Sequence, residues 1–279
     1  MYTTITKFKI PSILEDILKD LQKIGATPIL VGGCVRDYFL NIPVKDYDVE
    51  IFGIDCIQTI EKSLQKFGSV KLVGKSFGVL TLRVNEYDFD FALPRTETKI
   101  GLSHQDFEVI TNASLSFKEA AIRRDFTINA IGYDFFKEEF IDPFDGIEDL
   151  RTKTIKHIND KTFIEDSLRV YRAVAFASRF NFKIEEKTKE LCKQIVLKNE
   201  LKYLPKERVY EEFKKLFLKS SKPSIGFELM REIGILKYFS ELQALINCIQ
   251  EPEYHPEGDV WVHTMMALDE MARILKEEN

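Results

Sequence analysis

The chain has 279 residues, of which 44% are hydrophobic and 30% charged, and its formal net charge is −5 at pH 7. This length predicts two or three domains, and the composition is typical of a soluble globular protein. No apolar run approaches the roughly 20 residues of a membrane-spanning helix, and the N-terminal residues lack the apolar core of a secretory signal. These features argue against a membrane protein and predict a cytoplasmic one.

The first part of the chain carries alternating helix and strand signals. Apolar residues three or four apart predict a helix over 12–24, and TPILV at 27–31 is predicted to be a buried strand. Gly32 and Gly33 then turn the chain into a second helix. β-Branched and aromatic residues between glycines predict four more strands, at 47–52, 70–74, 78–84 and 87–93.

Residues 94–117 are polar and weakly patterned, which predicts a long loop that has a functional reason for its length. From about residue 118 onward helix signals dominate, apart from a strand pair at 130–133 and 139–142. The order of these elements predicts an α/β head of about 140 residues followed by a helical remainder.

Two aspartates flank Tyr47 in the second predicted strand. Side chains two positions apart on a strand share a face, so Asp46 and Asp48 project together and repel each other. A hard cation such as Mg²⁺ removes this conflict because it binds carboxylate and phosphate oxygens. A second pair, Asp88 and Asp90, has the same spacing, and two such pairs on neighbouring strands would suit the two ions of nucleotidyl transfer. The alternative is a set of solvated surface carboxylates.

The glycine turn before the second helix predicts an anion site. The first N–H groups of a helix have no partner within it, and Arg36 on the first turn adds a donor for phosphate oxygens. The alternative is a turn needed only for packing, with Arg36 and Asp37 as a surface ion pair. Without the other motifs, the turn alone favours a role in packing.

Together these motifs resemble the polymerase-β-like nucleotidyltransferases, and more narrowly the class II tRNA nucleotidyltransferases (CCA-adding enzymes) and the bacterial poly(A) polymerases. The resemblance extends along most of the chain, and its motifs occur in the family's order. They are GG-x-V-R-D followed by D-x-D within 32–48, RRDFTINA at 123–130, DPFDG at 142–146, EDSLRVYR at 165–172 and ER-x-x-x-E at 207–212.

The resemblance implies a fold and a division into domains. It implies a catalytic head with a mixed five-stranded sheet and helices over residues 1–140, followed by all-α neck and body domains. The neck, at 141–215, would recognise the nucleotide base, and the body, at 216–250, would bind tRNA. Residues 251–279 would begin a truncated C-terminal HD-like segment.

The resemblance also implies roles for single residues. Asp46 and Asp48 would ligate Mg²⁺, with two ions in the site. The third catalytic carboxylate would be Asp90 rather than Asp88, because in the family it lies five residues before an arginine, here Arg95. Contacts to the nucleotide would come from Gly32, Gly33, Arg36, Arg124, Asp125 and Asn129, and in the neck from Asp166, Arg169 and Arg172.

The neck residues have a chemical rationale of their own. Asp166, Arg169 and Arg172 recur every three positions, which predicts that they share one side of a helix. Aspartate accepts a hydrogen bond and arginine only donates, so the pair matches the edge that cytosine and adenine share and rejects uracil and guanine. Each good contact would contribute about 1–3 kcal/mol of discrimination. The alternative is an ordinary salt-bridged helix. Family members often carry a further arginine at the position of Ala175.

These expectations predict template-independent transfer from CTP and ATP to the 3′ end of tRNA. The polar stretch 94–117 fits the flexible loop of CCA-adding and A-adding members, and an A-adding enzyme or a poly(A) polymerase stays an alternative. Residues 151–222 hold 19 Lys and Arg against 10 Asp and Glu, a balance that fits the path of a tRNA acceptor stem. The lysines concerned are Lys187, Lys189, Lys193, Lys198, Lys202, Lys206, Lys214 and Lys215.

Two alternatives come from other classes. A catalytically silent RNA-binding protein on this scaffold would be expected to lack the carboxylates, and a small-molecule nucleotidyltransferase would not need the neck motif. HPEGDVWVHTMM at 255–266 resembles the opening of an HD phosphohydrolase domain, but the chain contains no His-Asp dipeptide. We therefore expect no phosphohydrolase activity from this chain. The sequence makes no prediction about oligomeric state.

Overall fold

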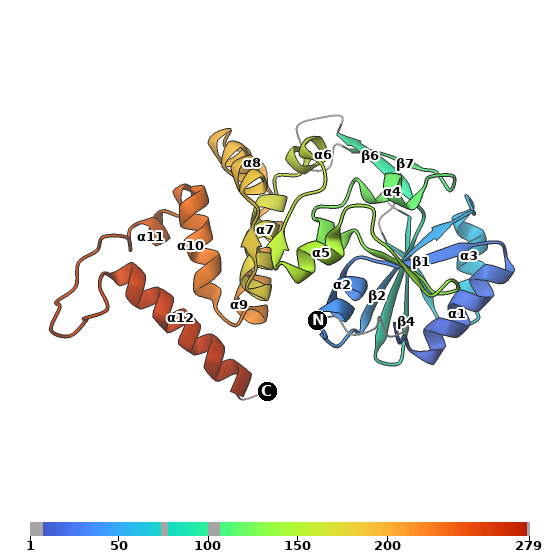
Figure 1. The fold of residues 1–279 in the computed structure, drawn as a ribbon, viewed down its shortest axis with the longest axis horizontal. Helices are drawn as coiled ribbons and strands as arrows, with labels where there is room; N and C mark the ends of the chain where they lie inside the picture. Colours follow the sequence, from blue (N-terminus) through green and yellow to red (C-terminus); the bar gives the residue numbers. More distant parts are fainter. Residues whose placement is uncertain (1–7, 74–77, 100–106, 278–279) are drawn as a thin grey trace. The chain divides into compact units, whose positions relative to one another are not determined.

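The structure is a computed structural model that describes residues 8–73, 78–99 and 107–277. The chain divides into two compact units, residues 1–151 and 152–279. The first unit is α/β and the second almost entirely helical (Figure 1). The finer division into neck, body and C-terminal segment stays a prediction. Among the described residues, no helix combines the length and apolar character that crossing a bilayer requires.

The first unit is built on a mixed seven-stranded sheet in the order β3-β4-β5-β2-β1-β8-β9. β2 and β5 are parallel, and every other neighbouring pair is antiparallel. The strands are β1 (Thr27–Val31), β2 (Asp46–Phe52), β3 (Val70–Val73), β4 (Val79–Val84), β5 (Tyr87–Ala92), β8 (Gly132–Asp134) and β9 (Glu139–Ile141).

The mixed α/β architecture is confirmed, but the predicted count of five strands is wrong. The β8–β9 hairpin, predicted only as a strand pair, extends the same sheet beside β1. The reason is burial: four of the five residues of β1 are buried, so its backbone groups need partners on both sides. β2 satisfies one side and β8 the other.

Helices and a small second sheet complete the first unit. The apolar stripe predicted for 12–24 forms α1 (Ser12–Lys23), which buries Leu14, Ile17, Leu18 and Leu21. Ser63 and Lys66 both donate to Asp20 Oδ2 of α1, at 2.6 and 2.7 Å, so α1 lies beside α3 (Ile57–Leu64). The other helices are α2 (Gly33–Phe39), α4 (Phe117–Ala121), the 3₁₀ turn η1 (Thr127–Asn129) and α5 (Gly146–Arg151).

The predicted loop at 94–117 is corrected in part. Its described residues form an antiparallel pair, β6 (Arg95–Lys99) and β7 (Phe107–Thr111), while residues 100–106 lie outside the described residues. The first segment contains two threonines and the second a valine, an isoleucine and a threonine, β-branched residues that favour extended backbone. Charged residues within the two segments hid this signal in the sequence.

The second unit is a helical assembly centred on α7 (Arg169–Phe180), which packs against α9 and α10. Gly226 allows close approach, because a Cβ there would lie 2.5 Å from Leu216 Cδ1. A two-residue parallel pair, β10 with β11, is an exception to the predicted all-α structure. The remaining elements are β10 (Thr154–Ile155), α6 (Asp160–Glu165), β11 (Lys183–Ile184), α8 (Glu186–Leu197), η2 (Glu200–Tyr203), α9 (Lys206–Lys219), α10 (Pro223–Ile233), η3 (Ile235–Tyr238), α11 (Ser240–Gln243) and α12 (Val260–Glu277).

Candidate active site

The parallel pairing of β2 with β5 brings the predicted aspartates together. In its register Asp46 lies opposite Asp88, and Asp48 lies opposite Asp90. The alternate residues of both strands, such as Tyr47, are buried beneath the sheet, so the four aspartates share the other face. The carboxylate oxygens of Asp46, Asp48 and Asp90 do not all lie within 4.8 Å of one another, as repulsion between like charges favours.

Asp48 occupies the most crowded position of this acidic cluster. Solvent reaches its carboxylate, yet protein atoms surround it on the other sides, and this desolvation raises its pKa. The charges of Asp90 and Asp46 raise the pKa further, while Arg124 and the Gly33 backbone N–H lower it. Negative charge therefore accumulates here beyond what the protein itself neutralises.

The glycine turn lies directly against Asp48. α2 begins at Gly33, and Gly32 before it has φ 72°, a conformation that favours glycine. A Cβ on Gly32 would lie 3.0 Å from Asp48 Oδ2 and 3.3 Å from Arg124 Nη1. The backbone angle therefore favours glycine at this position, and any larger side chain would also press against the Asp48 carboxylate.

Three predicted nucleotide-binding residues form one buried network. Arg36 is 5% exposed, and its Nε and Nη2 lie 2.8 and 2.7 Å from Asp37 Oδ1. Its Nη1 donates to Asn129 Oδ1 at 2.7 Å, and Asn129 Nδ2 donates to Asp125 Oδ1 at 2.9 Å. The ion pair between Arg36 and Asp37, weighed in the sequence as a surface feature, is thus buried and joined to the RRDFTINA segment.

Sequence reasoning missed Glu50, which lies two residues beyond Asp48 on the same strand. Its side chain is buried, and it accepts from Arg123 Nη2 at 3.2 Å and from Arg124 Nη2 at 3.3 Å. Glu50 therefore holds Arg124 in the position from which its charge acts on Asp48. The signal was the D-x-D-x-E spacing, which continues the same strand face.

The predicted helix face at 166–172 needs a correction. Asp166 is not helical: it ends α6 with φ −120° and ψ 97°, and its Oδ1 accepts from the Leu168 N–H at 3.2 Å just before α7 begins. This bond to the N–H two residues further on closes a turn between the two helices, which favours non-helical backbone at the aspartate itself. Asp166 therefore precedes the helix that carries Arg169 and Arg172.

The partners of these neck residues come from distant segments. Arg208 of α9 donates from Nη2 to Asp166 Oδ2 at 3.1 Å, and Arg169 Nη1 donates to the Thr162 carbonyl at 2.9 Å. Arg172 Nη1 lies 3.7 Å from Glu212 Oε1. The residues of the ER-x-x-x-E motif thus contact those of the ED-x-x-R-x-x-R motif. An open hollow of about 290 Å³ lies beside them, lined by Leu168, Glu207, Arg208, Glu211 and Glu212.

Many of the lysines predicted to follow a tRNA stem have acidic partners within 4.0 Å. Lys189 is the most covered of them, since its side chain is 16% exposed and its Nζ lies 2.8 Å from Glu232 Oε1. Lys202 instead lies over the ring of Tyr203, with Nζ 4.8 Å from the ring centre. The other paired lysines are Lys187, Lys193, Lys214 and Lys215.

Two family models match the chain. One described as "Poly A polymerase head domain" matches residues 29–156, and one described as "Probable RNA and SrmB- binding site of polymerase A" matches residues 181–246. The "Multifunctional CCA protein" of Pseudoalteromonas atlantica is 39% identical over 249 residues, covering 88% of this chain and 59% of that protein. The protein of the same name from Mannheimia succiniciproducens is 40% identical over 250 residues, with 88% and 57% covered. The chain therefore spans less than three fifths of the length of these curated relatives.

Solved structures agree with these relatives. A tRNA nucleotidyltransferase complexed with a primer tRNA and an incoming ATP analogue superposes with a TM-score of 0.67 at 29% identity, covering 85% of this chain and 64% of that one. A CCA-adding enzyme complexed with ATP superposes with a TM-score of 0.68 at 27% identity, with 88% and 56% covered. The fold, the order of motifs and these likenesses agree, and the chain belongs to the class II tRNA nucleotidyltransferase (CCA-adding enzyme) family.

Proposed function

We propose that this protein adds CCA to the 3′ end of tRNA, taking nucleotidyl units from CTP and ATP without a nucleic-acid template. The observation that carries the proposal is the parallel register that sets Asp46 and Asp48 beside Asp90, under the Gly32 turn. The relatives named multifunctional CCA proteins, and the related structures with CTP, ATP and primer tRNA, support the choice of substrates. With tRNA and free nucleotides as substrates, the protein would act in the cytoplasm.

The acidic cluster fits Mg²⁺. Its donors are hard carboxylate oxygens, and the pKa of Asp48 is raised by desolvation and by the charges of Asp90 and Asp46, which an added cation would offset. Asp46 and Asp48 would hold two ions, with Asp90 positioned beside them by a 2.7 Å hydrogen bond from Thr81. When bound, the ions would lower the pKa of the attacking 3′-hydroxyl and offset charge on the departing pyrophosphate.

The chain's own cations would orient the triphosphate. Arg124, whose positive charge acts on Asp48, would attract a phosphate oxygen to the same place. Glu50 would hold the Arg124 guanidinium in place through the hydrogen bond from Nη2 to Oε2 at 3.3 Å. The Gly32 turn leaves space for the phosphates, and the network from Arg36 through Asn129 to Asp125 would fix the ribose contacts.

Base selection would take place in the second unit. Asp166 would accept from the exocyclic amine of cytosine or adenine, and Arg169 would donate to the adjacent ring nitrogen. Arg208 contacts one carboxylate oxygen of Asp166 while the Leu168 N–H contacts the other, so the acceptor is already oriented. Phosphates of the acceptor stem would contact the lysines of 151–222, and the exposed Tyr203 ring beside Lys202 offers a stacking surface.

Addition of A residues alone is a second candidate, because the model that matches the head is described as that of a poly(A) polymerase. One assay separates the two. The purified chain is incubated with tRNAs that end before CCA, after C and after CC, in separate lanes with CTP, ATP or both. CCA addition predicts that every substrate is completed to CCA in the lanes with both nucleotides and then stops. Growth only in ATP lanes would support the second candidate, and no growth in any lane would contradict both.

A further inference from the structure

His157 is a buried side chain of the second unit that the chemistry proposed above does not use. It follows β10, precedes α6 and is 5% exposed. Its Nδ1 lies 2.7 Å from Thr188 Oγ1 of α8, and its Nε2 lies 2.7 Å from Asp160 Oδ1 at the start of α6. The imidazole ring thus joins two helices that lie side by side (Figure 1).

The acceptor on α6 fixes one proton of this ring. Hydrogen bonds from Lys187 and His157 lower the pKa of Asp160, so its carboxylate is ionised and can only accept. Nε2 of His157 therefore carries a proton and donates to Asp160. Nδ1 faces the Thr188 hydroxyl, which can donate or accept, so the bond to Asp160 forms whether the ring is neutral or charged.

The threonine belongs to the capped start of α8. Thr188 is fully buried, and its backbone N–H and its hydroxyl donate to Glu185 Oε2 at 3.0 and 2.7 Å. The backbone N–H of His157 also donates to Thr188 Oγ1, at 3.1 Å. Both the backbone and the ring of His157 are therefore held by α8, and its Nε2 is presented to α6.

α6 needs such a contact because it is short. It has 6 residues, fewer than the roughly 12–15 that an isolated helix needs in water. The Phe163 ring of α6 is buried, with its centre 5.4 Å from that of the His157 ring. Lys187 Nζ of α8 adds an exposed contact to Asp160 Oδ1 at 2.8 Å. His157 thus gives α6 both an apolar and a polar contact.

α6 leads directly to the two groups that would recognise the base. Asp166 ends the helix, and the Thr162 carbonyl within it accepts from Arg169 Nη1 at 2.9 Å. A shift of α6 would therefore move the Asp166 carboxylate and release the Arg169 guanidinium together. Misplacement of a positioned group by about 1 Å can cost about 100-fold in rate.

We propose that His157 is a positioning residue for base selection. It holds α6 against α8, and α6 in turn holds Asp166 and Arg169 at the spacing that accepts cytosine and adenine. This inference rests on the proposed function of Asp166 and Arg169 in base recognition. The competing interpretation is that His157 stabilises the second unit without any effect on nucleotide choice.

The test compares nucleotide selectivity with stability. His157→Phe keeps a ring beside Phe163 but loses both side-chain hydrogen bonds. His157→Gln places an amide nitrogen as many bonds from Cβ as Nε2 is, so it can still donate to Asp160. In competition between nucleotides during single additions to tRNA, His157→Phe should lower discrimination against UTP and GTP by at least about 5-fold, the weakest discrimination expected of one good base contact. His157→Gln should restore most of it.

Two further variants separate positioning from stability. Asp160→Ala removes the other end of the contact at a side chain that is 52% exposed, so it should fold, and it should lower discrimination as His157→Phe does. Lys237→Met removes hydrogen bonds at the opposite end of α8, to the Val196 carbonyl at 2.6 Å and to Asn199 Oδ1 at 2.7 Å. It should lower Tm and leave discrimination unchanged.

Thermal unfolding followed by circular dichroism supplies the stability of each variant. Unchanged discrimination in both His157→Phe and Asp160→Ala would overturn the proposal, and so would an equal loss in Lys237→Met. Asp166→Ala is the reference. If it also keeps full discrimination, the proposed base recognition fails together with this inference, whereas a loss confined to Asp166→Ala contradicts only the role of His157.

Discussion

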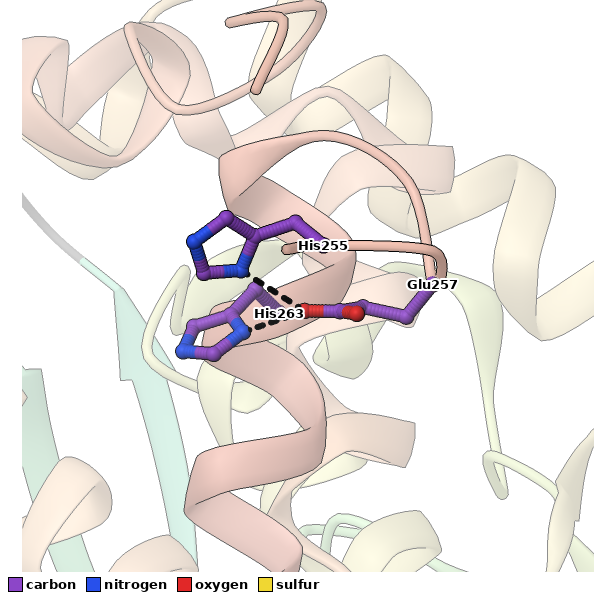
Figure 2. Close-up of side chains that lie close together, drawn as sticks. All are labelled: His255, Glu257 and His263. Carbon is purple, nitrogen blue, oxygen red and sulfur yellow. Dashed lines mark hydrogen bonds and ion pairs between the residues drawn. The ribbon is translucent and has the colours of Figure 1, made fainter. Parts of the chain in front are cut away.

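Asp48 in the first unit and Glu257 in the second are both accessible carboxylates, and their environments act on them in opposite directions. Asp48 is desolvated and faces two further aspartates, so its pKa is raised. Glu257 accepts hydrogen bonds from two imidazoles (Figure 2), so its pKa falls to about 2. The first pKa is raised by desolvation and like charges, and the second is lowered mainly by hydrogen bonds to the ionised carboxylate. The immediate surroundings of each carboxylate thus decide the direction in which its pKa moves.

The largest expected effect comes from removing one charge of the acidic cluster. Asp46→Asn should lower the rate of nucleotide addition by more than about 100-fold, because a ligand of the predicted Mg²⁺ site is lost. Asp88→Asn is the matched control: Asp88 lies opposite Asp46 but faces Arg83, with Asp88 Oδ1 3.7 Å from Arg83 Nε. Addition to tRNA in a gel assay is the measurement. Equal losses in both variants would refute the distinct role of Asp46.

A third carboxylate, Asp166, extends the comparison to a group held by arginine. Asp166→Ala should reduce discrimination of CTP and ATP against UTP and GTP by about 1–3 kcal/mol, since the acceptor for the base amine disappears. Competition between nucleotides during single additions to tRNA measures this ratio. Glu190→Gln, an exposed change on α8, is the control and should leave the ratio intact. Unaltered selectivity in Asp166→Ala would remove this residue from base recognition.

Glu50 allows two carboxylates of one strand to be compared. It is buried between two arginines, and it lies only two residues from the accessible Asp48. Glu50→Gln should lower the free energy of unfolding by about 2 kcal/mol, as two charge-assisted hydrogen bonds weaken. It should also lower nucleotide affinity, because Arg124 loses its support. Urea unfolding and ATP binding measure the two effects. Reduced stability with normal ATP binding would restrict Glu50 to a structural role.

The smallest effects are opposite shifts in stability, measured without metal in the presence of a chelator. The folded pKa of Asp48 lies above its ordinary value of 3.8, so its stabilising contribution exists below that pH and is lost as pH rises. Glu257 has its pKa depressed from 4.5 to about 2, so its contribution exists above pH 4.5 and is lost as pH falls through about 2.

At pH 7, therefore, Asp48→Asn should raise Tm and Glu257→Gln should lower it. Both differences should shrink as the medium becomes acidic, that of Glu257→Gln between about pH 4.5 and pH 2. Thermal unfolding followed by circular dichroism over this pH range is the measurement. Shifts of the same sign in both variants would show that their environments do not differ as described.

Much of the first unit was predictable, because strand alternation is a local property. The period of two along β2 alone puts Asp46 and Asp48 on one face, and the stripe of α1 follows from its apolar spacing. The polar segment at 94–117 was predicted wrongly because composition outweighed its strand pattern. The helical position of Asp166 was wrong because spacing by three cannot reveal that this residue lies in a turn before the helix, where its side chain accepts from the Leu168 N–H.

By itself the sequence determined the family, the α/β head and the strand face that carries the aspartates, since each depends on neighbours in the chain. Only the tertiary structure decided that Asp48 pairs in register with Asp90, that Glu50 joins two arginines, and that Arg208 supports Asp166 from 42 residues away. It also set Glu257 between two histidines. Such contacts arise from the packing of separate elements, and no periodicity along the chain encodes which charged groups will meet.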